Sequence, residues 1–139
     1  MSSSDFGRPH PTPEQLAAVP LLASLNRQQL TDLAGLIEVE EVPSGHSIVR
    51  EGAAGYAFYI LIEGTAQVRH GDTVVRTLGP QDYFGEVAMI ENAGRRTATV
   101  AALEPCVVWS MFGTTYRVLE TEHPEIAKVL QEAAESRRD

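Results

Sequence analysis

The feature that most constrains the fold is a series of glycines that interrupts short strand-like runs between residues 38 and 112. The glycines stand at positions 45, 52, 55, 64, 71, 79, 85 and 94. The runs between them are rich in β-branched and aromatic residues and cover 37–42, 47–50, 56–63, 65–70, 74–78, 98–102 and 106–111. Glu63-Gly64 and Gly71-Asp72 are typical of tight hairpin turns. Many short strands with regular glycine turns predict a β-sandwich or a jelly-roll barrel. A parallel α/β sheet is disfavoured, because no helical period separates the strands.

Two short helices are predicted before the strands. Thr12 can cap the first, with Pro13 as its first residue and Gln15 placed to close a capping box. Asn26 and Gln29 repeat that spacing at the start of the second. An apolar helical face follows at Leu30, Leu33, Ala34 and Ile37. This face must pack on another part of the fold.

The C-terminal segment again predicts helices. Thr114 can cap a short helix that runs to about Glu122. His123-Pro124 ends it, because a residue before proline avoids the helical region. Pro124 then begins the last helix. That helix carries an apolar stripe at Ile126, Val129, Leu130, Ala133 and Ala134.

Composition narrows the classes of function. A chain of 139 residues suits one domain, and we expect a mobile tail at 1–11, helices within 12–36, a barrel at 37–112 and C-terminal helices within 114–138. The net charge of −8 argues against non-specific binding to nucleic acid. We see no membrane-spanning run and no signal peptide. The single cysteine, Cys106, lies in an apolar run and is predicted to be a buried structural thiol. These features together predict a cytoplasmic protein.

The segment 83–100 carries the groups needed to hold a phosphate and a sugar hydroxyl. An aromatic pair leads to Gly85, which would let the backbone approach a ligand closely. Residues 86–89 could form a single helical turn with unpaired N–H groups, which attract anions. An arginine can neutralise a phosphodiester with two hydrogen bonds, but only one of Arg95 and Arg96 can point inward from a strand. Glu86 would repel a phosphate, so it is better placed to accept hydrogen bonds from a ribose hydroxyl.

These residues resemble the phosphate-binding cassette of cyclic nucleotide-binding domains. The resemblance rests on Phe84-Gly85-Glu86-Val87-Ala88-Met89 followed by Arg96-Thr97-Ala98-Thr99-Val100. Early strands and turns agree as well, at Pro43-Ser44-Gly45-His46-Ser47-Ile48, Arg50-Glu51-Gly52, Phe58-Tyr59-Ile60-Leu61 and Gly64. The similarity covers about residues 20 to 135. It implies a mainly β fold, a jelly roll (double-stranded β-helix) with N-terminal helices and C-terminal lid helices.

The resemblance also implies a role for each cassette residue. Gly85 and Ala88 would offer backbone N–H groups to the cyclic phosphate, Arg96 would pair with its charge, and Thr97 would add an N–H group.

The sugar and the base involve further residues by the same resemblance. Glu86 would bind the ribose 2′-hydroxyl, and Val87 would line the base pocket. A hydroxyl residue after the arginine can contact guanine in this family, so Thr97 leaves cGMP open beside cAMP. The helix at 124–138 resembles the lid helix that folds over the base.

The leading interpretation is therefore a regulatory module that binds cAMP or cGMP and acts in trans, on a protein partner or as a homodimer. No DNA-binding or membrane-binding role is expected of this chain. We expect no catalytic residues, no metal site and no other cofactor. Two alternatives remain, a ligand-free interaction domain with a vestigial pocket and a cupin-type metal enzyme. The second would need a His-x-His metal set, whereas His10, His46, His70 and His123 are scattered.

Overall fold

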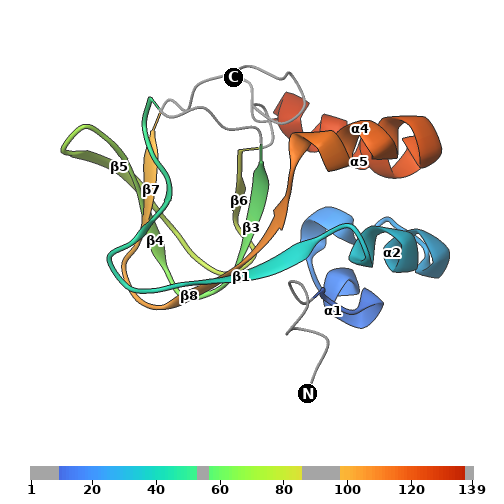
Figure 1. The fold of residues 1–139 in the computed structure, drawn as a ribbon, viewed down its shortest axis with the longest axis horizontal. Helices are drawn as coiled ribbons and strands as arrows, with labels where there is room; N and C mark the ends of the chain where they lie inside the picture. The colour runs from blue at the N-terminus through green and yellow to red at the C-terminus, as the bar shows by residue number, and fades with distance from the viewer. Residues whose placement is uncertain (1–9, 53–56, 86–97, 137–139) are drawn as a thin grey trace.

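Two antiparallel sheets and a layer of helices make up the fold (Figure 1). The computed structural model describes residues 10–52, 57–85 and 98–136. Within these ranges, one four-stranded sheet has the order β1-β8-β3-β6 and the other has the order β2-β7-β4-β5. The predicted mainly β fold with flanking helices is confirmed.

The strands lie where the sequence predicted them, within one or two residues. The first sheet contains β1 (Glu38–Val42), β8 (Cys106–Met111), β3 (Phe58–Glu63) and β6 (Tyr83–Phe84). The second contains β2 (Ser47–Val49), β7 (Thr99–Ala102), β4 (Ala66–His70) and β5 (Thr73–Leu78). Gly64 and Gly71 have φ values of 91° and 57°, the left-handed region that glycine enters without steric cost. Both hairpin turns are therefore as predicted.

Both N-terminal α-helices begin at the predicted caps. In α1 (Pro13–Ala17), the Thr12 hydroxyl accepts from Gln15 N, and the Gln15 side chain accepts from Thr12 N. Asn26 and Gln29 form the same reciprocal pair at the start of α2 (Arg27–Ala34). A short 3₁₀ helix, η2 (Pro20–Leu22), connects them.

The C-terminal helices differ from the prediction at one point. Helix α4 (Gly113–Glu122) begins one residue before Thr114, and Phe112 is its N-cap without a side-chain hydrogen bond. The prediction of Thr114 as cap was therefore wrong, because β8 runs directly into the helix. As predicted, α4 ends at His123, and α5 (Pro124–Ser136) begins at the proline.

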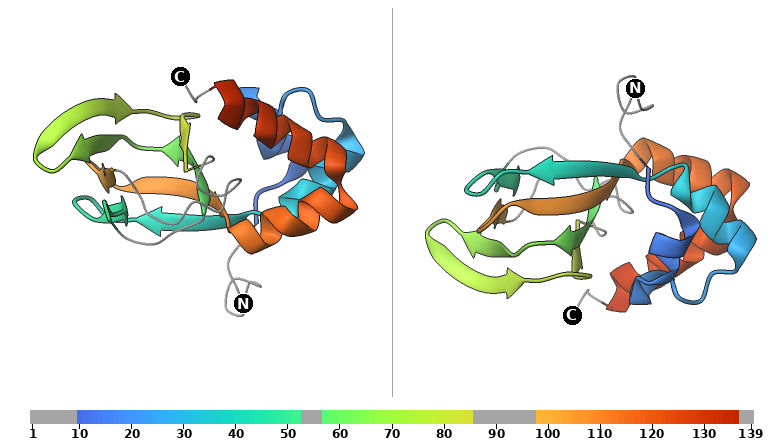
Figure 2. Two further views of the ribbon diagram at one scale, coloured as in Figure 1. Left: turned by 90° about the horizontal axis from the view of Figure 1, so that it is seen from above. Right: turned by 90° about the horizontal axis from the view of Figure 1, so that it is seen from below.

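The strand pairing brings the N-terminal and C-terminal helices together. Helix α2 leads into β1, and β8 leads into α4; Glu38 at the start of β1 pairs with Ser110 near the end of β8. Both helical segments must therefore lie at the same end of this sheet. The two views of Figure 2 show α1, α2, α4 and α5 gathered there.

Two hydrophobic cores share the first sheet. The face toward the helices contributes Phe58, Ile60, Trp109 and Met111 to one core. The helices add the rest of it, including Leu16, Leu22, Leu30, Leu33, Tyr116, Leu119, Ile126 and Leu130. The opposite face contributes Leu61, Phe84, Cys106 and Val108 to a second core, and the second sheet adds Ala66, Val68, Leu78, Val100 and Ala102. Because side chains alternate along a strand, each central strand contributes to both cores.

The predicted tail falls outside the described residues except for its last two positions. His10 Nδ1 lies 2.6 Å from the Ile37 carbonyl oxygen, and Pro11 is buried. His10 and Pro11 therefore contact the rest of the domain. Among the residues that the structure describes, no helix has the length and apolar character to cross a membrane.

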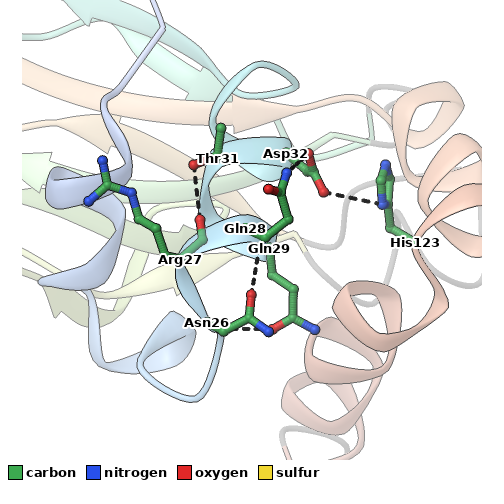
Figure 3. Close-up of polar contacts among 7 residues, drawn as sticks. All are labelled: Asn26, Arg27, Gln28, Gln29, Thr31, Asp32 and His123. Carbon is green, nitrogen blue, oxygen red and sulfur yellow. Dashed lines mark hydrogen bonds and ion pairs between the residues drawn. The ribbon is translucent and has the colours of Figure 1, made fainter.

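One polar contact connects the N-terminal and C-terminal helices (Figure 3). His123 Nδ1 lies 3.7 Å from Asp32 Oδ2, and each side chain is about one-third exposed, at 32% and 30%. The other Asp32 oxygen accepts from Gln28 Nε2 at 2.9 Å. The contact joins α2 to the point where α4 gives way to α5.

Candidate functional site

The first predicted ligand residue, Gly85, lies directly after β6. Its φ is 87°, a conformation that L side chains rarely adopt. A residue with a Cβ would be strained here, so this position requires glycine. The backbone conformation gives one reason for a glycine here, and the predicted contact of Gly85 with a ligand stays a prediction.

The turn before β6 is held by backbone and side-chain hydrogen bonds. Gln81 N donates to Leu61 O at 2.6 Å, and Leu61 N donates to Asp82 O at 2.8 Å. Asp82 also accepts from Gly79 N through Oδ2 at 2.7 Å. Gln81 is the single described non-glycine residue with positive φ, at 76°. These bonds fix where β6 enters the sheet.

On the far side of the predicted cassette the chain returns as β7. Thr99 pairs with Arg69 of β4, and its Oγ1 accepts from Glu51 N at 3.0 Å. Glu51 Oε1 in turn accepts from Gly71 N at 2.8 Å. Glu51 therefore ties together the end of β2, the β4–β5 turn and the start of β7.

A polar contact that sequence reasoning missed lies on the inner face of the first sheet. Ser110 is 1% exposed, and its hydroxyl donates to Glu40 Oε2 at 2.6 Å. Ser110 pairs with Tyr59 of the neighbouring strand β3, and Tyr59 in turn pairs with Phe84 of β6. Side chains alternate between the two faces along β1 and β8, and this alternation puts Glu40 and Ser110 on the same face as Val108. Only the strand register could bring them together.

The remaining cassette residues lie outside the described residues: Glu86, Val87, Ala88, Arg96 and Thr97. Their predicted roles stay predictions. The described flanks are β6 with Gly85 on one side, and Ala98 with β7 on the other. Phe84, Ala98 and Val100 all pack in the core between the two sheets.

Cys106 is a buried structural thiol, as predicted. It is 2% exposed, and its Sγ lies within hydrogen-bond distance of the Thr65 and Glu104 carbonyl oxygens, at 3.3 and 3.2 Å. Burial and the nearby Glu104 charge raise the pKa of this thiol, so it is a poor nucleophile at neutral pH. Within the described ranges, no three His, Cys, Asp or Glu side chains converge as metal ligands would.

Comparison with known proteins identifies the family. Residues 39–122, more than half of the chain, match the family described as "Cyclic nucleotide-binding domain". The chain belongs to this family. The resemblance drawn from the cassette and the early strands is therefore confirmed, and the family is a regulatory binding domain.

The curated relatives that the chain resembles are proteins of different kinds. The chain is 32% identical over 123 residues to a cyclic nucleotide-gated potassium channel of Rhizobium etli, covering 88% of this chain and 34% of the channel. It is 38% identical over 99 residues to the cGMP-dependent protein kinase, isozyme 1, of Drosophila melanogaster, covering 66% of this chain and 13% of the kinase. The chain thus spans about a third or less of these relatives.

Solved structures show the same fold. A putative cyclic nucleotide-binding protein from Geobacter metallireducens aligns with a TM-score of 0.77 and 25% identity, over 88% of this chain and 91% of that one. The regulatory domain of Toxoplasma gondii PKA, crystallised with cAMP, aligns with a TM-score of 0.78 and 26% identity, over 90% and 48%. The two sheets and flanking helices are thus those of a cyclic nucleotide-binding domain.

Proposed function

We propose that this chain binds a cyclic nucleotide, cAMP or cGMP, and acts as a regulatory module in the cytoplasm. The observation that carries the proposal is the family match over residues 39–122. The left-handed Gly85 directly after β6 is in keeping with it, because a residue without a Cβ lets a ligand approach the backbone closely. A buried lone cysteine suits a reducing compartment.

The proposed pocket uses the cassette residues in separate roles. Arg96 neutralises the cyclic phosphate, with N–H groups from Gly85, Ala88 and Thr97. Glu86 accepts from the ribose 2′-hydroxyl, where a carboxylate adds affinity without touching the phosphate.

The base and the output complete the proposal. Val87 lines the base pocket, and the Thr97 hydroxyl can contact guanine, which leaves cGMP open beside cAMP. Binding then acts in trans, through a protein partner or a second copy of this chain. No residue is assigned a catalytic role.

Titration calorimetry with cAMP and cGMP tests the proposal. We expect saturable binding of one nucleotide per chain, with 5′-AMP and 5′-GMP as the non-cyclic controls. Lack of binding of both cyclic nucleotides at millimolar concentration would contradict it and leave the ligand-free interaction domain.

Two neighbouring arginines provide a matched pair of variants. Arg96→Ala should weaken binding by roughly 2–5 kcal/mol, the range for one partner of a buried charge pair. Arg95→Ala removes the same charge one position earlier and should leave affinity nearly unchanged. The reverse pattern would assign the phosphate to Arg95.

A further variant addresses the base. Thr97→Ala should weaken cGMP more than cAMP, because the hydroxyl would contact the 2-amino group of guanine, which adenine lacks. Equal losses of affinity for the two nucleotides would show that the Thr97 hydroxyl does not distinguish guanine from adenine.

A further inference from the structure

The element that presents Gly85 is unusually short. Strand β6 has two residues, Tyr83 and Phe84, and it lies at the edge of its sheet with β3 as its paired neighbour. Two residues supply few ladder hydrogen bonds. Gly85 has no side chain of its own to fix its orientation, so side-chain contacts of β6 must contribute to holding it.

Aromatic contacts hold β6 on both of its faces. On the face toward the helices, the Tyr83 ring meets Phe58 edge to face, with centroids 5.9 Å apart and planes at 66°. On the inner face, the Phe84 ring stacks on Tyr59, with centroids 5.1 Å apart and planes at 19°. Tyr59 and Phe84 are direct cross-strand partners, the arrangement in which side chains contribute most to strand pairing.

The two contacts differ in their surroundings. The Phe58–Tyr83 pair belongs to the helix-side core, where Phe58 is 3% exposed. The Tyr59–Phe84 pair faces the space between the sheets, on the side that also carries Ala98 and Val100 after the cassette. Tyr59 is held in turn by β8, where it pairs with Ser110, whose hydroxyl is bonded to Glu40.

We propose that Tyr59 is a positioning residue for the nucleotide site: its ring fixes Phe84, and through Phe84 the backbone N–H of Gly85. The inference rests on the proposed function. Of the residues predicted to contact the phosphate, Gly85 is the one that the structure describes. Tyr59 itself touches no ligand in this proposal. It acts by reducing the conformations open to the residue that precedes the site.

Substitutions of Tyr59 test the role of the ring. Tyr59→Leu keeps an apolar side chain but removes the stack, and we expect the Kd for the preferred cyclic nucleotide to rise about tenfold. Tyr59→Phe keeps the stack and should bind within about twofold of the wild type. Equal losses in the two variants would overturn the stacking argument and point to the hydroxyl.

A destabilised control separates positioning from general stability. Leu30→Ala removes a buried side chain of α2, in the helix-side core rather than in the core that holds Tyr59 and Phe84. Measured well below the melting temperature of each variant, its Kd should match the wild type. An affinity loss equal to that of Tyr59→Leu would overturn the proposal.

A readout without nucleotide separates this inference from the proposed function. Amide hydrogen exchange at Gly85 in the free protein should be faster in Tyr59→Leu than in the wild type, Tyr59→Phe or Leu30→Ala. If the wild type bound no nucleotide, the proposed function would fail while this readout still tested the positioning of Gly85. Unchanged exchange and unchanged Kd in Tyr59→Leu would overturn the inference alone.

Discussion

Single residues decide several turns and buried contacts in this domain. Gly64 closes the β3–β4 hairpin in a left-handed conformation, and a Cβ there would lie 2.5 Å from the Pro105 carbonyl oxygen and 2.9 Å from Cys106 Sγ. Gly45 has a similar φ, 86°, but nothing lies within 4 Å of the corresponding position. A side chain at Gly45 would therefore cause backbone strain alone, whereas a side chain at Gly64 would cause both backbone strain and a steric clash.

Gly64→Ala should destabilise the fold more than Gly45→Ala. Left-handed strain alone costs about 1–2 kcal/mol, which is the expected loss for Gly45→Ala. Gly64→Ala adds the clash with backbone at Pro105 and should cost about 3 kcal/mol or more. The free energy of unfolding from urea titration measures both. Equal losses would show that the β7–β8 turn moves away without cost.

The buried phenol of Tyr116 should make the domain lose unfolding free energy at high pH. It is fully buried, its hydroxyl accepts from Gln131 Nε2 at 2.8 Å, and burial raises the pKa of its phenol. The folded state therefore holds this proton more tightly than the unfolded chain, so the stabilisation is complete below the unfolded pKa of about 10 and is lost as the pH rises further.

Tyr116→Phe should remove that part of the pH dependence. The variant loses about 1 kcal/mol at pH 7, because Gln131 loses its acceptor. Between pH 9 and 11 its free energy of unfolding should fall less steeply than that of the wild type. If the unfolding free energies of the two proteins fell equally with pH, the phenol of Tyr116 would not contribute to the pH dependence.

At the scale of elements, the helices at the two ends of the sequence form one layer. The β1–β8 pairing places α2 beside the junction of α4 and α5, and His123 and Asp32 meet there. The family resemblance predicts a lid role for α5, and the structure shows that α5 buries Ile126, Ala127 and Leu130 in the helix-side core. Any movement of α5 must therefore disturb its packing on the N-terminal helices.

Asp32→Asn should weaken this connection slightly. The Asp32 and His123 side chains are each about one-third exposed, and contacts between partly exposed charged groups contribute little to stability. We expect the variant to lose about 0.5 kcal/mol of unfolding free energy in a urea titration.

Glu14→Gln provides the matched control. It breaks the pair between Glu14 and Arg27, whose side chains are 63% and 72% exposed, and should change the free energy of unfolding less than Asp32→Asn does. Equal losses in the two variants would show that the Asp32–His123 contact contributes no more than a fully exposed pair.

At the scale of the molecule, the two cores meet through the central strands of the first sheet. Trp109 of β8 faces the helices while its neighbour Val108 faces the second sheet. Trp109 is the single tryptophan of the chain and is 5% exposed, so its fluorescence reports on the helix-side core. Unfolding of one core exposes strands that belong to the other, and we expect them to melt together.

The preferred cyclic nucleotide should raise the melting temperature recorded by Trp109 fluorescence. A ligand at 100 times its Kd that binds only the folded state stabilises it by about 2.7 kcal/mol, roughly 10 °C for a domain of this size. Arg96→Ala should show little shift at the same concentration, and 5′-AMP or 5′-GMP should show none. An equal shift with the non-cyclic nucleotides would contradict recognition of the cyclic phosphate.

The sequence by itself determined where most helices, strands and turns of this protein lie, and which family it belongs to. Capping residues, glycine turns and apolar alternation act over a few residues, so Thr12, Asn26, Gly64 and Gly71 could be interpreted without coordinates. The cap of α4 was mispredicted because the local signal at Thr114 competes with a strand that continues straight into the helix.

Only the tertiary structure decided which distant residues meet. The Ser110–Glu40 bond, the Tyr59–Phe84 stack and the His123–Asp32 contact each join segments that the sequence does not relate. They depend on strand order and register, which are set by the packing of the whole molecule. The left-handed conformation of Gly85, directly after the pairing of β6 with β3, is likewise seen only in the structure.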